Sequence, residues 1–97
     1  MISTDEIKKI LEKNSKSLVQ ELKQSKELVI LLNKSAYTKL SEEEKSKVKS
    51  QLLDVLKSIP ALAVFLLPGG LVLLPIIAKL IPDILPSTFR DHPDKDE

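Results

Sequence analysis

Between Lys57 and Lys79 the chain carries 21 consecutive uncharged residues, SIPALAVFLLPGGLVLLPIIA, rich in leucine, isoleucine, valine and alanine. As one α-helix this stretch would be about 30 Å long, which matches the hydrocarbon core of a bilayer. Prolines and one glycine pair interrupt it, and such residues end or kink helices. The residues at these breaks, with one proline just beyond the stretch, are Pro60, Pro68, Gly69, Gly70, Pro75 and Pro82. A single straight membrane-spanning helix is therefore not expected.

The breaks divide the apolar segment, residues 58–86, into shorter pieces. We expect a short helix over residues 61–67, a turn at residues 68–70, and a second helix over residues 71–81 with a bend at Pro75. Each helix would be only about 10 to 16 Å long, less than a bilayer. The pair could span a membrane as a broken helix, enter it as a re-entrant hairpin, or fold back on the rest of the chain. In lipid, the backbone groups freed by the turn would need protein or water partners.

The first half of the chain, residues 1–57, is basic, with 12 lysines and nine acidic residues. Ser3 and Glu6 have the spacing of a capping box, so a first helix should begin near Thr4. Its apolar residues recur at helical spacing and form one stripe, which is weakest at Asn14 and Ser25. The stripe consists of Ile7, Leu11, Leu18, Leu22, Val29 and Leu32. The lysines of the opposite face are expected to be solvated.

A second capping box, Ser41 to Glu44, predicts a second helix over residues 42–57. Its apolar stripe consists of Val48, Leu52, Val55, Leu56 and Ile59. The two amphipathic helices can pair as an antiparallel hairpin. The predicted fold is therefore all-α, an amphipathic helical hairpin followed by an apolar helical pair that proline and glycine break. It forms a single domain over residues 1–90, and residues 91–97 are expected to be a disordered acidic tail.

Two amphipathic helices offer limited surface for covering a segment that is apolar all round, and soluble monomers rarely expose large apolar patches. We therefore expect the apolar segment to be buried in a membrane or against a hydrophobic protein partner. The alternative is a soluble helical module that self-associates as a homo-oligomer. Lys79 and Asp83 are four residues apart and are expected to form an anchor pair at the membrane interface, although Pro82 interrupts the helix between them.

Composition excludes several classes of chemistry. The chain has no cysteine and a single histidine, which argues against a disulfide framework and against a zinc or other metal site. A net charge of +1 gives no overall attraction to nucleic acid, and sequence-specific binding is not expected. The one histidine, His92, lies in the acidic tail, and no catalytic constellation or cofactor motif is visible. The sequence predicts a protein that is not an enzyme and needs no cofactor.

The apolar segment resembles a known family. The proline spacing noted above, Lys79, and the motif LPSTF at residues 85–89 resemble the leucine zipper and EF-hand containing transmembrane (LETM) family of the mitochondrial inner membrane. The motif KLSEEEK, Asp54 and the step from Ile59 to Pro60 are also similar to that family. The resemblance covers residues 38–90. The chain is similar to the C-terminal piece, or to a minimal version, of LETM-like proteins of bacteria.

The resemblance implies a membrane segment at these residues and, in the family, roles in cation/proton exchange and in binding mitochondrial ribosomes through a helical domain. Two features depart from the family. Leu71 stands near the place where members carry a membrane glutamate, so proton-coupled transport lacks its obvious carrier. The helical ribosome-binding region is expected beyond LPSTF, where this chain ends. Ribosome binding would then depend on the basic helices, through Lys8, Lys9, Lys16 and Lys23.

These considerations predict a membrane-associated LETM-like protein of an inner membrane, with ribosome binding through its basic helices. The positive-inside rule would keep the basic half in the cytoplasm and the acidic tail outside. A component of a cation/proton transport system and a soluble oligomerisation module are the two alternatives. The basic helices could equally contact RNA phosphates or anionic lipid head groups, and the sequence does not separate the two.

Overall fold

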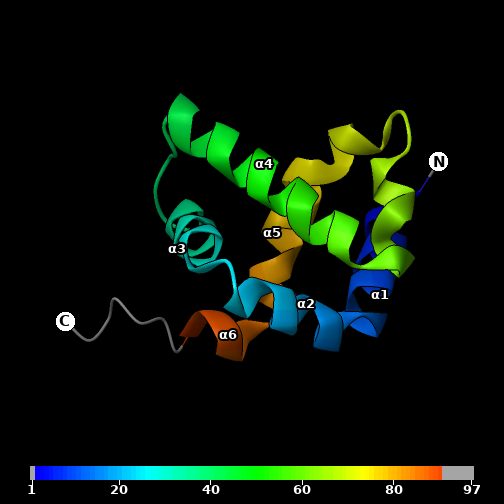
Figure 1. Cartoon of the computed structure of the whole chain (residues 1–97). Coiled ribbons are helices and arrows are strands. Elements are labelled where there is room, and N and C mark those ends of the chain that lie inside the picture. Colours follow the sequence, from blue (N-terminus) through cyan, green and yellow to red (C-terminus); the bar gives the residue numbers. More distant parts are fainter. Residues whose placement is uncertain (1, 91–97) are drawn as a thin grey trace.

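The computed structural model describes residues 2–90, and all regular secondary structure in this range is helical. The predicted all-α class is therefore confirmed (Figure 1). In chain order the helices are α1 Thr4–Lys13, α2 Ser15–Lys23, α3 Lys26–Ser35, α4 Glu42–Ser58, the 3₁₀ helices η1 Pro60–Leu66 and η2 Gly70–Leu73, α5 Leu74–Ile84, and α6 Pro86–Arg90. The predictions for His92 and for the acidic tail lie outside the described residues.

Residues 4–35 form three short helices, α1, α2 and α3. The prediction of one continuous first helix from the apolar stripe is therefore wrong. The helix breaks at the two weak points, Asn14 and Ser25, whose backbone angles are not helical. The Asn14 side chain donates a hydrogen bond to the carbonyl oxygen of Ile10 at 2.8 Å, and such side-chain bonds compete with the helical ladder. All six apolar residues of the stripe are nevertheless buried, which confirms the predicted buried face.

Both predicted capping boxes are present and begin α1 and α4. The amide of Ser3 donates to Glu6 at 2.8 Å, and the amide of Glu6 donates back to the Ser3 hydroxyl at 3.2 Å. Ser41 and Glu44 make the same exchange at 2.9 and 3.1 Å. These bonds satisfy amide donors that the first turn of a helix leaves free.

Helices α3 and α4 form the predicted helical hairpin and pack against each other. Figure 1 shows α3 end-on and α4 side-on, so the two arms cross. Polar contacts join them at two points. The Lys34 ammonium lies 2.6 Å from Glu44, and Glu27 accepts hydrogen bonds from Gln51 at 2.7 Å and Lys47 at 3.3 Å. The ion pairs are partly exposed, so they orient the hairpin more than they stabilise it.

The apolar segment folds as two pieces joined by the predicted turn at residues 68–70, between η1 and η2. Gly69 has φ of 90°, a conformation that glycine adopts without cost. Pro75 lies at the start of α5, where the missing amide is harmless. The 3₁₀ helix η2 gives way to α5 just before it, and the bend expected at Pro75 stays a prediction. Pro82 lies inside the last turn of α5, and the helix continues to Ile84 instead of stopping at the proline.

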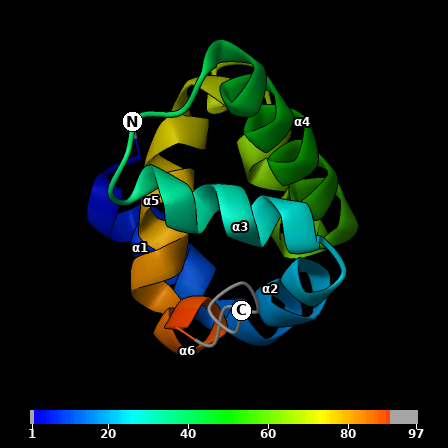
Figure 2. The same cartoon turned by 90° about the vertical axis from the view of Figure 1, so that its left-hand side faces the viewer.

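Helix α5 lies near the middle of the molecule in Figure 1, between α3 and α1, and α3 lies in front of it in Figure 2. It packs against α1, α3 and α4, and η1 packs against α4. Leu74, Ile77 and Ile81 of α5 and Leu62 and Phe65 of η1 are buried. The other helices therefore cover much more of the apolar segment than the sequence predicts, because α1, α3 and α4 all pack against α5.

Four large apolar side chains remain exposed on η1, η2 and the turn between them, and we call this group the apolar turn. It comprises Val64, Leu67, Leu71 and Val72, with exposed fractions of 47%, 58%, 44% and 73%. As predicted, the amphipathic helices leave part of the apolar segment exposed, but only at this end of the segment.

In residues 2–90 no single helix combines the length and hydrophobicity needed to cross a membrane. The bent pair Pro60–Leu66 and Gly70–Ile84 meets both criteria together, with an angle of 104° at the break. Length and composition thus permit a broken or re-entrant span, as expected from the sequence.

The close approach at Gly70 yields a first prediction. A Cβ atom at this position would collide with the carbonyl group of Phe65, whereas a Cβ on Gly69 meets no atom within 4 Å. Gly70→Ala should lower the free energy of unfolding by about 2 to 3 kcal/mol through overpacking. Gly69→Ala should lower it by about 1 kcal/mol, through backbone strain alone. Urea denaturation measures both, and an equal loss in the two variants would contradict the tight contact.

The α3–α4 hairpin yields a second prediction, on acid stability. The hydrogen bond from Lys34, followed by the Ser41 amide, lowers the pKa of Glu44 from its ordinary value of 4.5. The bonds from Gln51 and Lys47 lower the pKa of Glu27 in the same way. A carboxylate with a lowered folded pKa stabilises the protein above its ordinary pKa, and this stabilisation is lost as the pH falls through the folded value.

The free energy of unfolding should therefore decrease as the pH falls below about 4.5, and Lys34→Met should make this decrease shallower. Lys23→Met is the matched control, because within residues 2–90 Lys23 forms no ion pair. Urea denaturation at a series of pH values measures the slope. A slope unchanged by Lys34→Met, or changed equally by Lys23→Met, would remove Lys34 as the cause.

Candidate functional site

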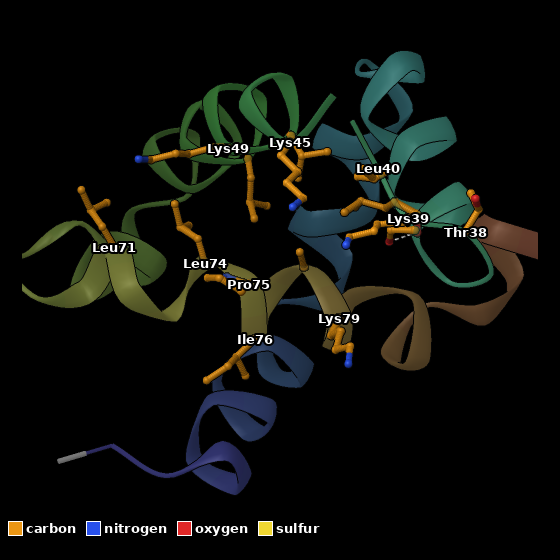
Figure 3. A pocket seen from close by; sticks show the side chains of 15 residues that line it. Thr38, Lys39, Leu40, Lys45, Lys49, Leu71, Leu74, Pro75, Ile76 and Lys79 are labelled. Carbon is orange, nitrogen blue, oxygen red and sulfur yellow. Dashed lines mark hydrogen bonds between the residues drawn. The ribbon is translucent and has the colours of Figure 1, made fainter. Parts of the chain in front are cut away.

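An open groove of about 750 Å³ lies between the α3–α4 hairpin and the η2–α5 segment (Figure 3). Its lining comprises nine apolar residues, two hydroxyl residues and four lysines. Ligand sites of small molecules have volumes of about 300 to 1,000 Å³ and mostly apolar walls with a few polar groups. We call it the lysine groove, and it is the candidate functional site.

Apolar residues at helical spacing form the floor of the groove, because residues one turn apart lie on the same face of a helix. Val48 and Leu52 are one helical turn apart on α4, so they share the face that looks toward α5. Leu74 lies opposite, at the start of α5, where Pro75 sets the direction of the helix. Leu71 of η2 lies at one end of the groove and also belongs to the apolar turn. The floor therefore continues into the exposed apolar turn.

Four lysines form the rim: Lys39, Lys45, Lys49 and Lys79. Lys45 and Lys49 are four residues apart on α4, Lys39 comes from the loop before that helix, and Lys79 comes from α5 on the other side (Figure 3). Lys45 lies 3.4 Å from Glu42, an exposed pair of little energetic weight. Within residues 2–90 the other three rim lysines form no ion pair.

A positive rim above an apolar floor suits a ligand that is anionic at one end and apolar at the other. No acidic side chain of residues 2–90 is part of the lining, so the positive potential is not cancelled locally. The same part of the chain contains no group of three or more acidic, histidine or cysteine side chains that could hold a metal ion. The groove thus offers a ligand a positively charged rim and an apolar floor.

The lysines predicted to bind a partner lie elsewhere. Lys8 and Lys9 are exposed on α1, and Lys16 and Lys23 are exposed on α2. Of these, Lys9 contributes to a smaller hollow of about 400 Å³, which the acidic residue Glu12 also lines. The structure therefore places these four lysines on two consecutive helices and outside the lysine groove.

The predicted anchor pair is not formed as an ion pair. Lys79 and Asp83 are both exposed on α5, but within residues 2–90 no ion pair joins them. Lys79 instead contributes to the groove rim. The break residues Pro60, Pro68, Gly69 and Gly70 lie at the ends of η1 and η2, next to the apolar turn.

Sequence reasoning missed the groove lysines Lys39, Lys45 and Lys49. The spacing of Lys45 and Lys49 does place them on one face of α4, yet a pair of lysines four residues apart usually indicates only a solvated face. These lysines line a groove only because α5 folds back beneath α4, and no local sequence pattern shows that packing.

Comparison with known proteins agrees with this arrangement. The family model described as "LETM1-like, RBD" matches residues 40–97, which is 58 of the 97 residues. The chain belongs to the LETM1-like family. The match includes α4, the whole apolar segment and eleven of the fifteen residues that line the lysine groove, so the resemblance seen in the proline spacing and LPSTF is confirmed.

Two curated relatives are mitochondrial LETM1 domain-containing proteins of yeasts. The chain is 34% identical to mdm28 of Schizosaccharomyces pombe over 82 residues and 34% identical to YLH47 of Saccharomyces cerevisiae over 76 residues. The alignments cover 84% and 78% of this chain but only 17% and 16% of the relatives. The chain thus spans about one sixth of the length of these relatives. No solved structure matches it.

Proposed function

We propose that this LETM-like domain is a non-enzymatic membrane-associated module that binds the surface of an inner membrane through the apolar turn. The observation that carries the proposal is the cluster of four large apolar side chains exposed on η1, η2 and their connecting turn. A contiguous exposed apolar patch of this kind typically marks a membrane or protein contact.

The packing of α5 limits how deeply the domain can enter a bilayer in this conformation. Ile77 and Ile81 are fully buried against the other helices, so the core-facing side of the segment is not available to lipid. A surface element of this type inserts about 5 to 10 Å, to the boundary between head groups and acyl chains. The lysine groove next to the turn would then face the head groups, where lysines are attracted to anionic lipids.

A third prediction tests the apolar turn. The double variant Leu67→Asp/Val72→Asp should bind phospholipid vesicles at least about tenfold more weakly than the unmodified chain, because it exchanges two exposed apolar side chains for charges. Vesicle co-sedimentation measures the change on neutral and on anionic vesicles. Tyr37→Asp is the matched control, since Tyr37 is 75% exposed but lies in the loop between α3 and α4.

Unchanged vesicle binding by the double variant would contradict the proposed contact. A different occupant, a second copy of the chain, would be revealed by analytical ultracentrifugation without vesicles. In that case the unmodified chain would sediment as an oligomer, the double variant would sediment as a monomer, and membrane association would be replaced by self-association.

Ribosome binding is a second candidate function, favoured by the basic helices. Lys8, Lys9, Lys16 and Lys23 are exposed, and in the part of the chain that the structure describes none of them forms an ion pair. Free lysines on consecutive helices can contact RNA phosphates. The letters RBD in the description of the matching family model are consistent with a ribosome-binding domain, and the matched residues 40–97 begin after these four lysines. The domain would then hold ribosomes near the membrane.

A fourth prediction tests this role. Replacing Lys8, Lys9, Lys16 and Lys23 by Glu should strongly weaken co-sedimentation with ribosomes, and the remaining binding should depend less steeply on salt because fewer phosphate contacts are made. The matched control replaces the four groove lysines by Glu, which changes the net charge equally. An equal loss in both variants would indicate general charge attraction, and no loss in the first would remove the α1–α2 surface.

A further inference from the structure

We infer that the lysine groove binds a single anionic phospholipid, with the phosphate of the head group at Lys39, Lys49 and Lys79 and the first part of an acyl chain along the apolar floor. This inference deepens the proposed function and rests on it in one respect, because the membrane supplies the lipid.

The charge of the groove selects an anion. Lys39, Lys49 and Lys79 come from three different elements and line one hollow. In Figure 3 the ammonium ends of Lys49 and Lys79 extend away from each other. None of the three has an ion-pair partner among residues 2–90, and the lining that the structure describes contains no carboxylate. Each ammonium carries three hydrogen-bond donors on a flexible four-carbon stem, so the three side chains can turn toward a phosphate at the mouth of the groove.

The floor selects an apolar tail in addition to the anion. Nine of the fifteen lining residues are apolar. A free phosphate would occupy only the rim and would leave this surface in contact with water, whereas an acyl chain would remove it from water. A lipid therefore uses both parts of the groove.

The position of Leu71 gives the lipid a route to the bilayer. This residue lines the groove and is itself 44% exposed as part of the apolar turn. An acyl chain that follows the floor past Leu71 would leave the groove where the apolar turn enters the membrane. The head group would remain on the rim lysines, and the rest of the lipid would stay in its leaflet.

Other anionic partners fit the groove less well. Single-stranded RNA would require aromatic side chains for stacking, and none is part of the described lining. An acidic peptide would require polar partners for its backbone groups. The described lining offers the hydroxyls of Ser35 and Thr38, and the Ser35 hydroxyl already donates to the carbonyl of Leu32 at 2.7 Å.

The test uses a lipid that needs no membrane. Dihexanoyl phosphatidylglycerol, kept below its micelle concentration, is titrated into the full chain and followed by two-dimensional amide NMR. Saturable binding to one site is expected, with shifted signals around the groove. Dihexanoyl phosphatidylcholine and inorganic phosphate should each bind at least about tenfold more weakly, because the first lacks net charge and the second lacks the tail.

Three variants locate the site. Lys39→Gln/Lys49→Gln/Lys79→Gln should bind the anionic lipid about 100-fold more weakly, at about fivefold for each lysine near a lipid anion. Lys8→Gln/Lys16→Gln/Lys23→Gln removes the same charge from α1 and α2 and should bind as the unmodified chain does. Ala78→Phe fills the floor while keeping every rim charge, and it should weaken lipid binding but not the weak binding of phosphate. Circular dichroism and thermal unfolding confirm that each variant is folded.

Failure of this inference is distinguishable from failure of the proposed function. The apolar-turn variant Leu67→Asp/Val72→Asp should still bind the soluble lipid even though it leaves vesicles. Equal loss in the two lysine variants, equal affinity for the two lipids, or phosphate binding as tight as lipid binding would each overturn the lipid site. Displacement of the lipid by an oligouridine at lower concentration would also overturn it, in favour of RNA.

Discussion

The sharp turn between η1 and η2 determines where the rest of the apolar segment lies. Gly70 packs directly against the backbone of Phe65, and Gly69 adopts a positive φ. Together they turn the chain by 104° within a few residues. This turn directs α5 back into the molecule, where its apolar side is buried by helices from the first half. Without it, residues 60–84 would form one long apolar rod that these helices could not cover.

The broken first half is the counterpart of this turn. A continuous helix over residues 4–35 would be about 48 Å long and would touch α5 along a short line only. Interruptions at Asn14 and Ser25 divide it into three helices, of which α1 and α3 pack against α5 and α2 packs between them against α4, while the buried stripe from Ile7 to Leu32 keeps one face toward the core. The polar residues that weaken the stripe locally are therefore what allows the global packing.

Local signals predicted much of the fold, and distant contacts account for the errors. Both capping boxes, the buried stripes and the turn at Gly69 and Gly70 follow from short-range chemistry and are found as predicted. The effect of Pro82 was misjudged because a proline can lie in the last turn of a helix without ending it. The lysine groove could not be predicted, since it requires α4, the loop at Lys39 and α5 to meet in space.

The same turn that buries α5 also produces both surfaces that the proposed function uses. Folding back leaves the outer side of η1 and η2 without a covering helix, which exposes the apolar turn. It also brings Lys79, isolated in the sequence by apolar neighbours, opposite the lysines of α4. A straight span would place that charge at one end of a buried helix, far from any basic surface. The bent apolar segment of this LETM-like domain thus presents the apolar turn and one side of the lysine groove, the two surfaces on which the proposed function rests.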